Sequence, residues 1–170
     1  MTPETAIAET VPTFPKPLTG EEIAREAMAS PSQRRLTELQ EHLSNLPQVP
    51  CPLDHEFTNQ FYVRTIHVPA GTLVISKIFK ADFPFFISKG RVSVWIEGEG
   101  VVRRQAPYWG FTKAGTRRII MHHTDVDWST VHFTSAKSPD GAEAEIIFDP
   151  GEKHPEIDAS IINELKDETL

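Results

Sequence analysis

Residues 68–94 read VPAGTLVISKIFKADFPFFISKGRVSV, and this stretch decides the fold class. Gly71 and Gly90 bound two apolar runs rich in β-branched and aromatic residues, the composition of short strands. After Gly90, apolar residues at 92, 94 and 96 alternate with Ser93 and Trp95, which is the two-residue period of a strand. The stretch therefore predicts short strands joined by turns.

The same pattern extends to both sides of this stretch. Turn residues such as those at 98–100 separate nine expected strands, which fit a double-sheet jelly roll, so the predicted fold class is all-β. Residues 138–141 (SPDG) are expected to form a hairpin-like turn before the last strand. The nine expected strands are residues 61–68, 72–79, 83–87, 91–97, 101–105, 108–112, 117–123, 128–134 and 144–148.

The glycine spacing adds a resemblance to a known family. Cupins carry two signatures, roughly G-x5-H-x-H-x3-E-x6-G and P-x-G-x2-H-x3-N. Gly71 and Gly90 reproduce the first spacing without a gap, and Gly115, Arg118 and His122 map onto the second. Over about residues 60–135 the chain resembles the small single-domain cupins often encoded by bacteriophages. The resemblance implies a single cupin-like jelly-roll barrel and a bacteriophage origin.

At the ligand positions of these signatures, the chain has residues that cannot form the usual cupin metal site. Lys77, Phe79 and Phe83 occupy those of the first signature, and Arg118 occupies the histidine of the second. Divalent metals in such sites need neutral imidazoles and a carboxylate. Phenylalanine offers no lone pair, and lysine and arginine are cationic at neutral pH. We therefore predict no metal site and no bound cofactor, and we do not expect the catalysis that a cupin metal supports.

The replacing residues leave two alternatives for the barrel interior. In the first, the rings fill the former metal pocket, and each buried phenylalanine stabilises the core by about 1.5–3 kcal/mol. In the second, rings and cations form a slot for a small anionic ligand, such as a nucleotide or sugar phosphate, held by stacking and charge-assisted hydrogen bonds. The candidate ligand-binding residues are Lys77, Phe79, Phe83, Phe85, Arg118, His132 and Trp95.

Seven histidines also raise the hypothesis of a relocated metal or acid–base site. His122 and His123 are adjacent on one expected strand, so they point to opposite faces and at most one can join His132. His132 and Asp127 are five residues apart and are likewise expected on opposite faces. We expect isolated histidines, and a cupin enzyme with a relocated histidine site is the third functional hypothesis.

Outside the barrel (56–150), we expect a Pro-rich extended arm (1–19), a helical segment (20–47) and an acidic C-terminal helix or tail (151–170). Ser30 followed by Pro31 is typical of a helix start. In the helix that follows, Leu36, Leu39 and Leu43 form one apolar stripe. This stripe packs either on its own barrel or on another subunit.

Charge is divided unevenly within the net −7 of the chain. Residues 56–140 hold eleven Lys and Arg against seven Asp and Glu, and the remaining residues hold six against seventeen. The central region is therefore mildly basic and the two extensions are acidic. This difference in charge favours contacts between neighbouring subunits; alternatively, the acidic extensions only keep the protein soluble. The candidate interface residues are Arg103, Arg104 and the leucines at 36, 39 and 43. We expect Arg103 or Arg104 to meet an acidic terminus of a neighbour. The negative total disfavours specific nucleic-acid binding.

No apolar run approaches the roughly 18 residues of a membrane span, and residues 1–9 lack a secretory pattern. The single cysteine, Cys51, excludes an intrachain disulfide. We expect no membrane partner and a location in the host cytoplasm, with incorporation in a virion. The leading hypothesis is a non-catalytic phage-type cupin that acts as an assembly or virion structural component, as a homo-oligomer or with other virion proteins. The alternative is the small-anion-binding module described above.

Overall fold

The computed structural model describes residue 19, residues 36, 39–41 and 43–148, and residue 166. The expected arm (1–19), the helix start at Ser30 and the C-terminal helix therefore lie outside the described residues, apart from single positions. None of the helices within the described residues has the length and apolar character needed to cross a membrane.

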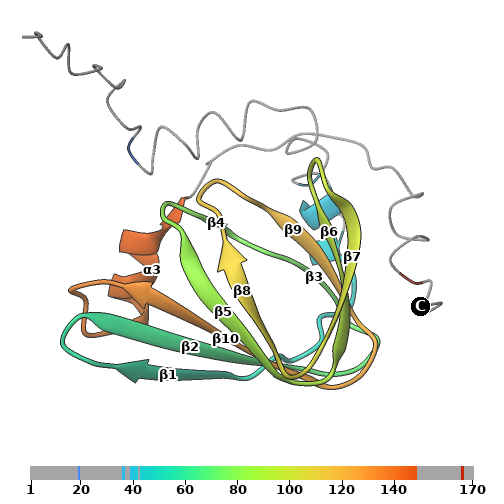
Figure 1. The fold of residues 1–170 in the computed structure, drawn as a ribbon, viewed down its shortest axis with the longest axis horizontal. Coiled ribbons are helices and arrows are strands. Elements are labelled where there is room, and N and C mark those ends of the chain that lie inside the picture. The colour runs from blue at the N-terminus through green and yellow to red at the C-terminus, as the bar shows by residue number, and fades with distance from the viewer. Residues whose placement is uncertain (1–18, 20–35, 37–38, 42, 149–165, 167–170) are drawn as a thin grey trace, which may run out of the picture.

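Two antiparallel sheets enclose the barrel interior (Figure 1). The five-stranded sheet has the order β1-β2-β10-β5-β8, the four-stranded sheet has the order β3-β9-β6-β7, and β11 pairs with β4. The elements are β1 (Leu53–Phe57), β2 (Phe61–Val68), β3 (Leu73–Ile75), β4 (Ile78–Phe79), β5 (Phe83–Lys89), β6 (Arg91–Ile96), β7 (Gly100–Gln105), β8 (Tyr108–Thr112), β9 (Arg118–His122), β10 (Val126–Phe133), α3 (Pro139–Ile146) and β11 (Ile147–Phe148). The described part of the chain is thus mostly β, as predicted.

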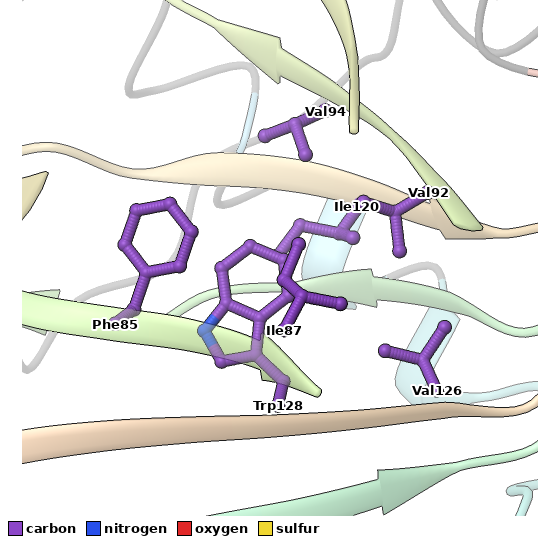
Figure 2. Packing of buried hydrophobic residues seen from close by; sticks show 7 residues of the cluster. All are labelled: Phe85, Ile87, Val92, Val94, Ile120, Val126 and Trp128. Carbon is purple, nitrogen blue, oxygen red and sulfur yellow. The ribbon is translucent and has the colours of Figure 1, made fainter. Parts of the chain in front are cut away.

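The main core lies between the two sheets (Figure 2). Antiparallel pairing of β6 with β9 places Val94 beside Ile120, so alternate residues of both strands face inward. Burial of these aliphatic and aromatic side chains is the main term that stabilises the barrel. The buried cluster is Phe85, Ile87, Val92, Val94, Ile120, Val126 and Trp128.

Gly90 shows why glycine is required at one position of the signature spacing. Its φ is +93°, and a Cβ built there would lie 2.2 Å from the backbone oxygen of Asp125. No other residue fits this position without a backbone shift. Gly71 and Gly115 also have positive φ, at 77° and 73°. The three glycines of the signature spacing therefore share a backbone conformation that other residues disfavour.

Two segments of the barrel differ from the predicted strands. The first strand, β1, pairs with β2 through Leu53 and Ile66 and was not predicted, because Asp54, His55 and Glu56 hide the strand pattern. The expected strand at 72–79 is interrupted after Ile75, so that β3 joins the four-stranded sheet and β4 pairs with β11.

The predicted turn at residues 138–141 is wrong, because these residues start helix α3. The Oγ of Ser138 accepts a hydrogen bond from the backbone N–H of Gly141, and Pro139 and Asp140 occupy the first turn. These are N-terminal helix signals, and burial of Ala142 and Ile146 sustains the helix. The strand expected at 144–148 is reduced to β11.

The leucine stripe packs on its own barrel, which was one of the two alternatives. Residues 36, 39–41 and 43–44 are helical, and Leu36 and Leu39 are buried against Ile119 on the outer face of the four-stranded sheet. Leu43 and Trp95 are partly buried in the same cluster. Within this chain, the stripe is therefore covered and does not present a free interface.

Candidate functional site

A cavity of about 120 Å³ lies inside the barrel, with walls from both sheets. Strands β5, β8 and β10 form one side, and β6, β7 and β9 form the other. Small-molecule sites usually combine apolar and aromatic walls with a few polar groups. The aromatic walls of this cavity include Phe85, Tyr108 and Trp128, and its charged residues are Glu99, Arg104 and Arg118.

Arg118 is the buried cation of this cavity. Its backbone pairs with Ile96 of β6, and its side chain is directed into the barrel, with only 7% of the residue exposed. Its Nη2 donates a hydrogen bond to the carbonyl oxygen of Phe111 at 3.3 Å. Its guanidinium carbon lies 5.2 Å from the centre of the Phe85 ring, a cation–π contact. These contacts hold the guanidinium at the cavity wall.

One donor of Arg118 lacks a partner. Its Nε is buried and has no hydrogen-bond acceptor among the described residues. Burial lowers the pKa of Arg118, whereas Glu99 and Tyr108 raise it and Arg104 lowers it. Arginine nevertheless stays protonated in proteins. A buried donor without a partner costs about 1–3 kcal/mol, so an acceptor in the cavity would be stabilised there.

Arg104 brings a second cation to the same cavity. It lies opposite Val92 in the β6–β7 register, whereas its neighbour Arg103 lies opposite Ser93. The guanidinium carbon of Arg104 is 4.8 Å from the centre of the Tyr108 ring, and Nη1 donates to the carbonyl oxygen of Arg103 at 3.0 Å. Arg103 and Arg104 therefore split between the two faces as predicted, and Arg104 lines the cavity. Contact of either arginine with an acidic terminus of a neighbour stays a prediction.

The aromatic wall is fixed by stacking and by one glycine. The rings of Phe85 and Trp128 stack with centroids 4.7 Å apart and planes 18° from parallel. A Cβ at Gly110 would lie 3.0 Å from Cε1 and Cζ of Phe85. Glycine at this position therefore lets the Phe85 ring lie directly against β8.

Phe79 and Phe83 lie in a second cluster, together with His132. The His132 ring stacks on Phe79 at 4.9 Å and lies 4.5 Å from the Phe83 ring, and Nε2 of His132 lies 3.0 Å from Oγ1 of Thr130. Tyr62 is fully buried beside them. Burial, together with a smaller contribution from the charge of Arg64, lowers the pKa of His132 to about 4. These rings pack against one another, which matches the core-filling alternative for these three residues.

Lys77 and Trp95 lie outside the cavity. The side chain of Lys77 is 51% exposed and forms an ion pair with Glu143 of α3, with Nζ and Oε2 3.1 Å apart. Trp95 packs with Leu36 and Leu39 on the outer face of the four-stranded sheet. Of the seven predicted ligand-binding residues, only Phe85 and Arg118 line the cavity.

None of the histidines within the described residues lines the cavity. His122 is buried with Nδ1 2.9 Å from the carbonyl oxygen of Thr72, and burial lowers its pKa to about 4. His122 and His132 belong to different parts of the interior, and neither lines the cavity. Asp127 pairs with His67 at 2.8 Å. No group of three or more His, Cys, Asp or Glu within the described ranges could hold a metal ion.

Comparisons with known proteins give structural likeness at low identity. No family model matches the chain, and no curated protein matches it. An RmlC-like cupin from Methanocaldococcus jannaschii is 11% identical with a TM-score of 0.43, over 51% of this chain and 82% of that one. A cupin superfamily protein from Desulfitobacterium hafniense is 9% identical with a TM-score of 0.44, over 52% and 82%. Similarity at this level does not establish membership of the family.

Sequence reasoning missed Glu99, Arg104 and Tyr108 as cavity residues. The alternation of β7 could have identified Arg104, because it shares the inner face with Val102. Tyr108 follows Pro107 at the start of β8, and Glu99 lies in the turn between β6 and β7, so no periodic pattern marks either residue.

Proposed function

We propose that this protein binds a small anion in the barrel cavity between Arg118 and Arg104. The observation that carries the proposal is the Nε of Arg118, a buried charged donor with no partner among the described residues. Hydrogen bonds between a guanidinium and a carboxylate or phosphate are short and strong, and burial from water strengthens them. The ligand would supply the acceptor that the described part of the chain does not provide.

The cavity volume limits the ligand to the small end of the predicted range. Sites for drug-sized molecules occupy about 300–1,000 Å³, whereas this cavity has about 120 Å³. A nucleotide is therefore too large to be enclosed, and a small carboxylate or an inorganic oxyanion such as phosphate or sulfate fits better. Phe85 and Trp128 would exclude water from one side of such an anion.

Isothermal titration calorimetry tests this proposal with phosphate, sulfate and acetate as separate probes. We expect one site per chain for at least one of these anions, with affinity reduced at least tenfold by Arg118→Met. Lys77→Met is the matched control, because it removes one cation that lies outside the cavity. If no anion binds, or if both variants bind alike, the proposal is wrong.

An assembly role is the second candidate. It was the leading prediction from the sequence, and one observation favours it. Large aromatic side chains are exposed together on the outer face of the five-stranded sheet. Exposed apolar patches of this kind often mark protein–protein contacts. Incorporation in a virion and a bacteriophage origin remain part of this proposal.

A further inference from the structure

The barrel cavity holds a carboxylate as well as two guanidinium groups. Glu99 lines it together with Arg104 and Arg118. Glu99 is exposed, whereas only 7% of Arg118 is exposed, so Glu99 stands where the cavity opens to solvent and Arg118 lies deeper. A bound ligand therefore meets a hydrogen-bond acceptor near the opening and a donor further inside.

The backbone brings Glu99 close to Arg118. Ile96 pairs with Arg118 across β6 and β9, and it pairs with Gly100 across β6 and β7. The backbone N–H of Glu99 donates to the carbonyl oxygen of Ile96 at 3.1 Å, so the turn closes directly beside the strand that carries Arg118. Burial lowers the pKa of Arg118, and the negative charge of Glu99 acts against this shift. The two side chains are therefore near enough to interact.

Glu99 nevertheless does not neutralise the arginines by direct contact. No ion pair among the described residues joins Glu99 to Arg104 or Arg118 within 4.0 Å. The two guanidinium groups lie instead over the rings of Tyr108 and Phe85. A ligand that carries both an anionic group and a hydrogen-bond donor can bridge the space between the cations and the carboxylate.

The charges of the cavity favour a ligand with a single negative charge. Two arginines and one glutamate leave a net charge of +1. A monoanion makes the site neutral, whereas a dianion such as sulfate leaves one negative charge and a zwitterionic amino acid leaves one positive charge. Unbalanced charge is costly in a site that is partly removed from water.

The cavity volume sets the length of the ligand. About 120 Å³ corresponds to about four water molecules at roughly 30 Å³ each. Bonded atoms lie closer together than separate waters, so a molecule of about five non-hydrogen atoms fits. Val94, Ile96 and Val102 supply aliphatic walls for a short carbon skeleton.

We infer that the ligand is a small hydroxycarboxylic acid, with its carboxylate on the Nε–H of Arg118 and its hydroxyl group donating to Glu99. The inference rests on the proposed anion site and names the ligand class of that site. A carboxylate accepts from a guanidinium, and a hydroxyl group donates to a carboxylate, so each end of the ligand has one complementary partner. Glu99 is then the residue that determines specificity, because it favours a donor and disfavours a second negative charge.

Calorimetry with glycolate and acetate tests this inference on the full chain, because the two acids differ by one hydroxyl group. We expect glycolate to bind about tenfold more tightly or better, the effect of a hydrogen bond to a charged group. In Glu99→Ala this preference should disappear. Glu97→Ala is the matched control, since it removes a carboxylate from the same turn at a residue that does not line the cavity, and it should keep the preference.

The outcomes separate this inference from the anion site. Equal affinity for glycolate and acetate in the wild-type protein, or a preference that survives Glu99→Ala, would overturn the hydroxycarboxylic acid and leave the anion site standing. A preference that Glu97→Ala also removes would overturn the contact with Glu99. If neither these acids nor the inorganic anions bind the wild-type protein, the anion site and the inference are both wrong.

A second variant tests the charge of Glu99 separately. Glu99→Gln removes the negative charge and keeps an oxygen acceptor. We expect it to retain part of the preference for glycolate and to bind sulfate more tightly than the wild-type protein does. Unchanged or weaker sulfate binding would contradict selection against dianions by Glu99.

Discussion

Arg118 on β9 and Phe85 on β5 meet across the barrel, with the guanidinium carbon 5.2 Å from the ring centre. The two residues belong to opposite sheets and are only 7% and 5% exposed. Their contact fixes a buried cation at the cavity wall, and the Nε of Arg118 has no partner among the described residues.

Replacing Arg118 by methionine should separate stability from ligand binding. In anion-free buffer, we expect the free energy of unfolding to stay equal or to rise by about 1–2 kcal/mol, because a buried donor without a partner is removed. With saturating anion, the wild-type protein should gain stability and the variant should not. Urea denaturation with and without phosphate, sulfate or acetate measures both effects. A loss of more than about 3 kcal/mol in anion-free buffer would instead assign Arg118 a structural role.

Gly110→Ala should narrow the cavity. The new Cβ would lie 3.0 Å from the Phe85 ring, so the ring must shift towards the cavity. We expect roughly tenfold weaker anion binding, which is about 1.4 kcal/mol, measured by calorimetry. Gly98→Ala serves as the control, since it strains a turn with φ of +80° without approaching any atom within 4 Å. If both variants weaken binding equally, the effect reflects general stability.

Most strands of the barrel were predictable from two signals in the sequence, the spacing of the glycines and the alternation of apolar residues. Positive φ at Gly71 and Gly90 and the alternation around Val94 are local properties, so the sequence contains them directly. Helix α3 was missed although Ser138 and Pro139 carry the helix-start signal that was recognised at Ser30 and Pro31. The apolar run at residues 144–148 (AEIIF) is equally typical of a strand, and only its last two residues form one.

Acid should destabilise the protein through two buried histidines. Burial lowers the pKa of both His122 and His132 to about 4, against about 6.5 for an unfolded chain. The unfolded state therefore binds more protons between these values, and stability is lost as the pH falls from about 6.5 to 4. Each histidine should contribute a slope of about 1 kcal/mol per pH unit. Denaturation at pH 7 and pH 5 measures the effect, and His132→Phe should reduce the slope by about half. An unchanged slope would contradict the assignment.

His67 should show the opposite dependence on pH. Its ring nitrogens lie 2.9 Å from Oδ2 of Asp54 and 2.8 Å from Oδ1 of Asp127. Hydrogen bonds to these two carboxylates raise the pKa of His67. Its contribution is complete below the unfolded value near 6.5 and is lost as the pH rises through the higher folded pKa. An NMR titration of the His67 ring measures this pKa, and Asp54→Asn should lower it. No change on that substitution would contradict the bridge between β1 and β10.

The candidate site was less predictable than the fold, because its residues come together only through the closing of two sheets. Arg118 and Phe85 were identified from the signature spacing and the aromatic cluster. Lys77 was expected with them, but β3 ends at Ile75 and Lys77 pairs with Glu143 on α3, an element that was not predicted. Arg104 was assigned to an interface because two adjacent arginines on a strand do not reveal which one faces inward.

The most direct test of the proposed anion site observes the Nε–H group of Arg118 itself. Proton–nitrogen NMR of the full chain resolves arginine Nε–H signals, and Arg118→Lys identifies the one that belongs to Arg118. We predict that this signal shifts in a saturable manner and exchanges more slowly with water when phosphate, sulfate or acetate is added, while the signal of Arg91 stays in place. An Arg118 signal that moves with none of the three anions, or only in parallel with Arg91, would contradict the anion site.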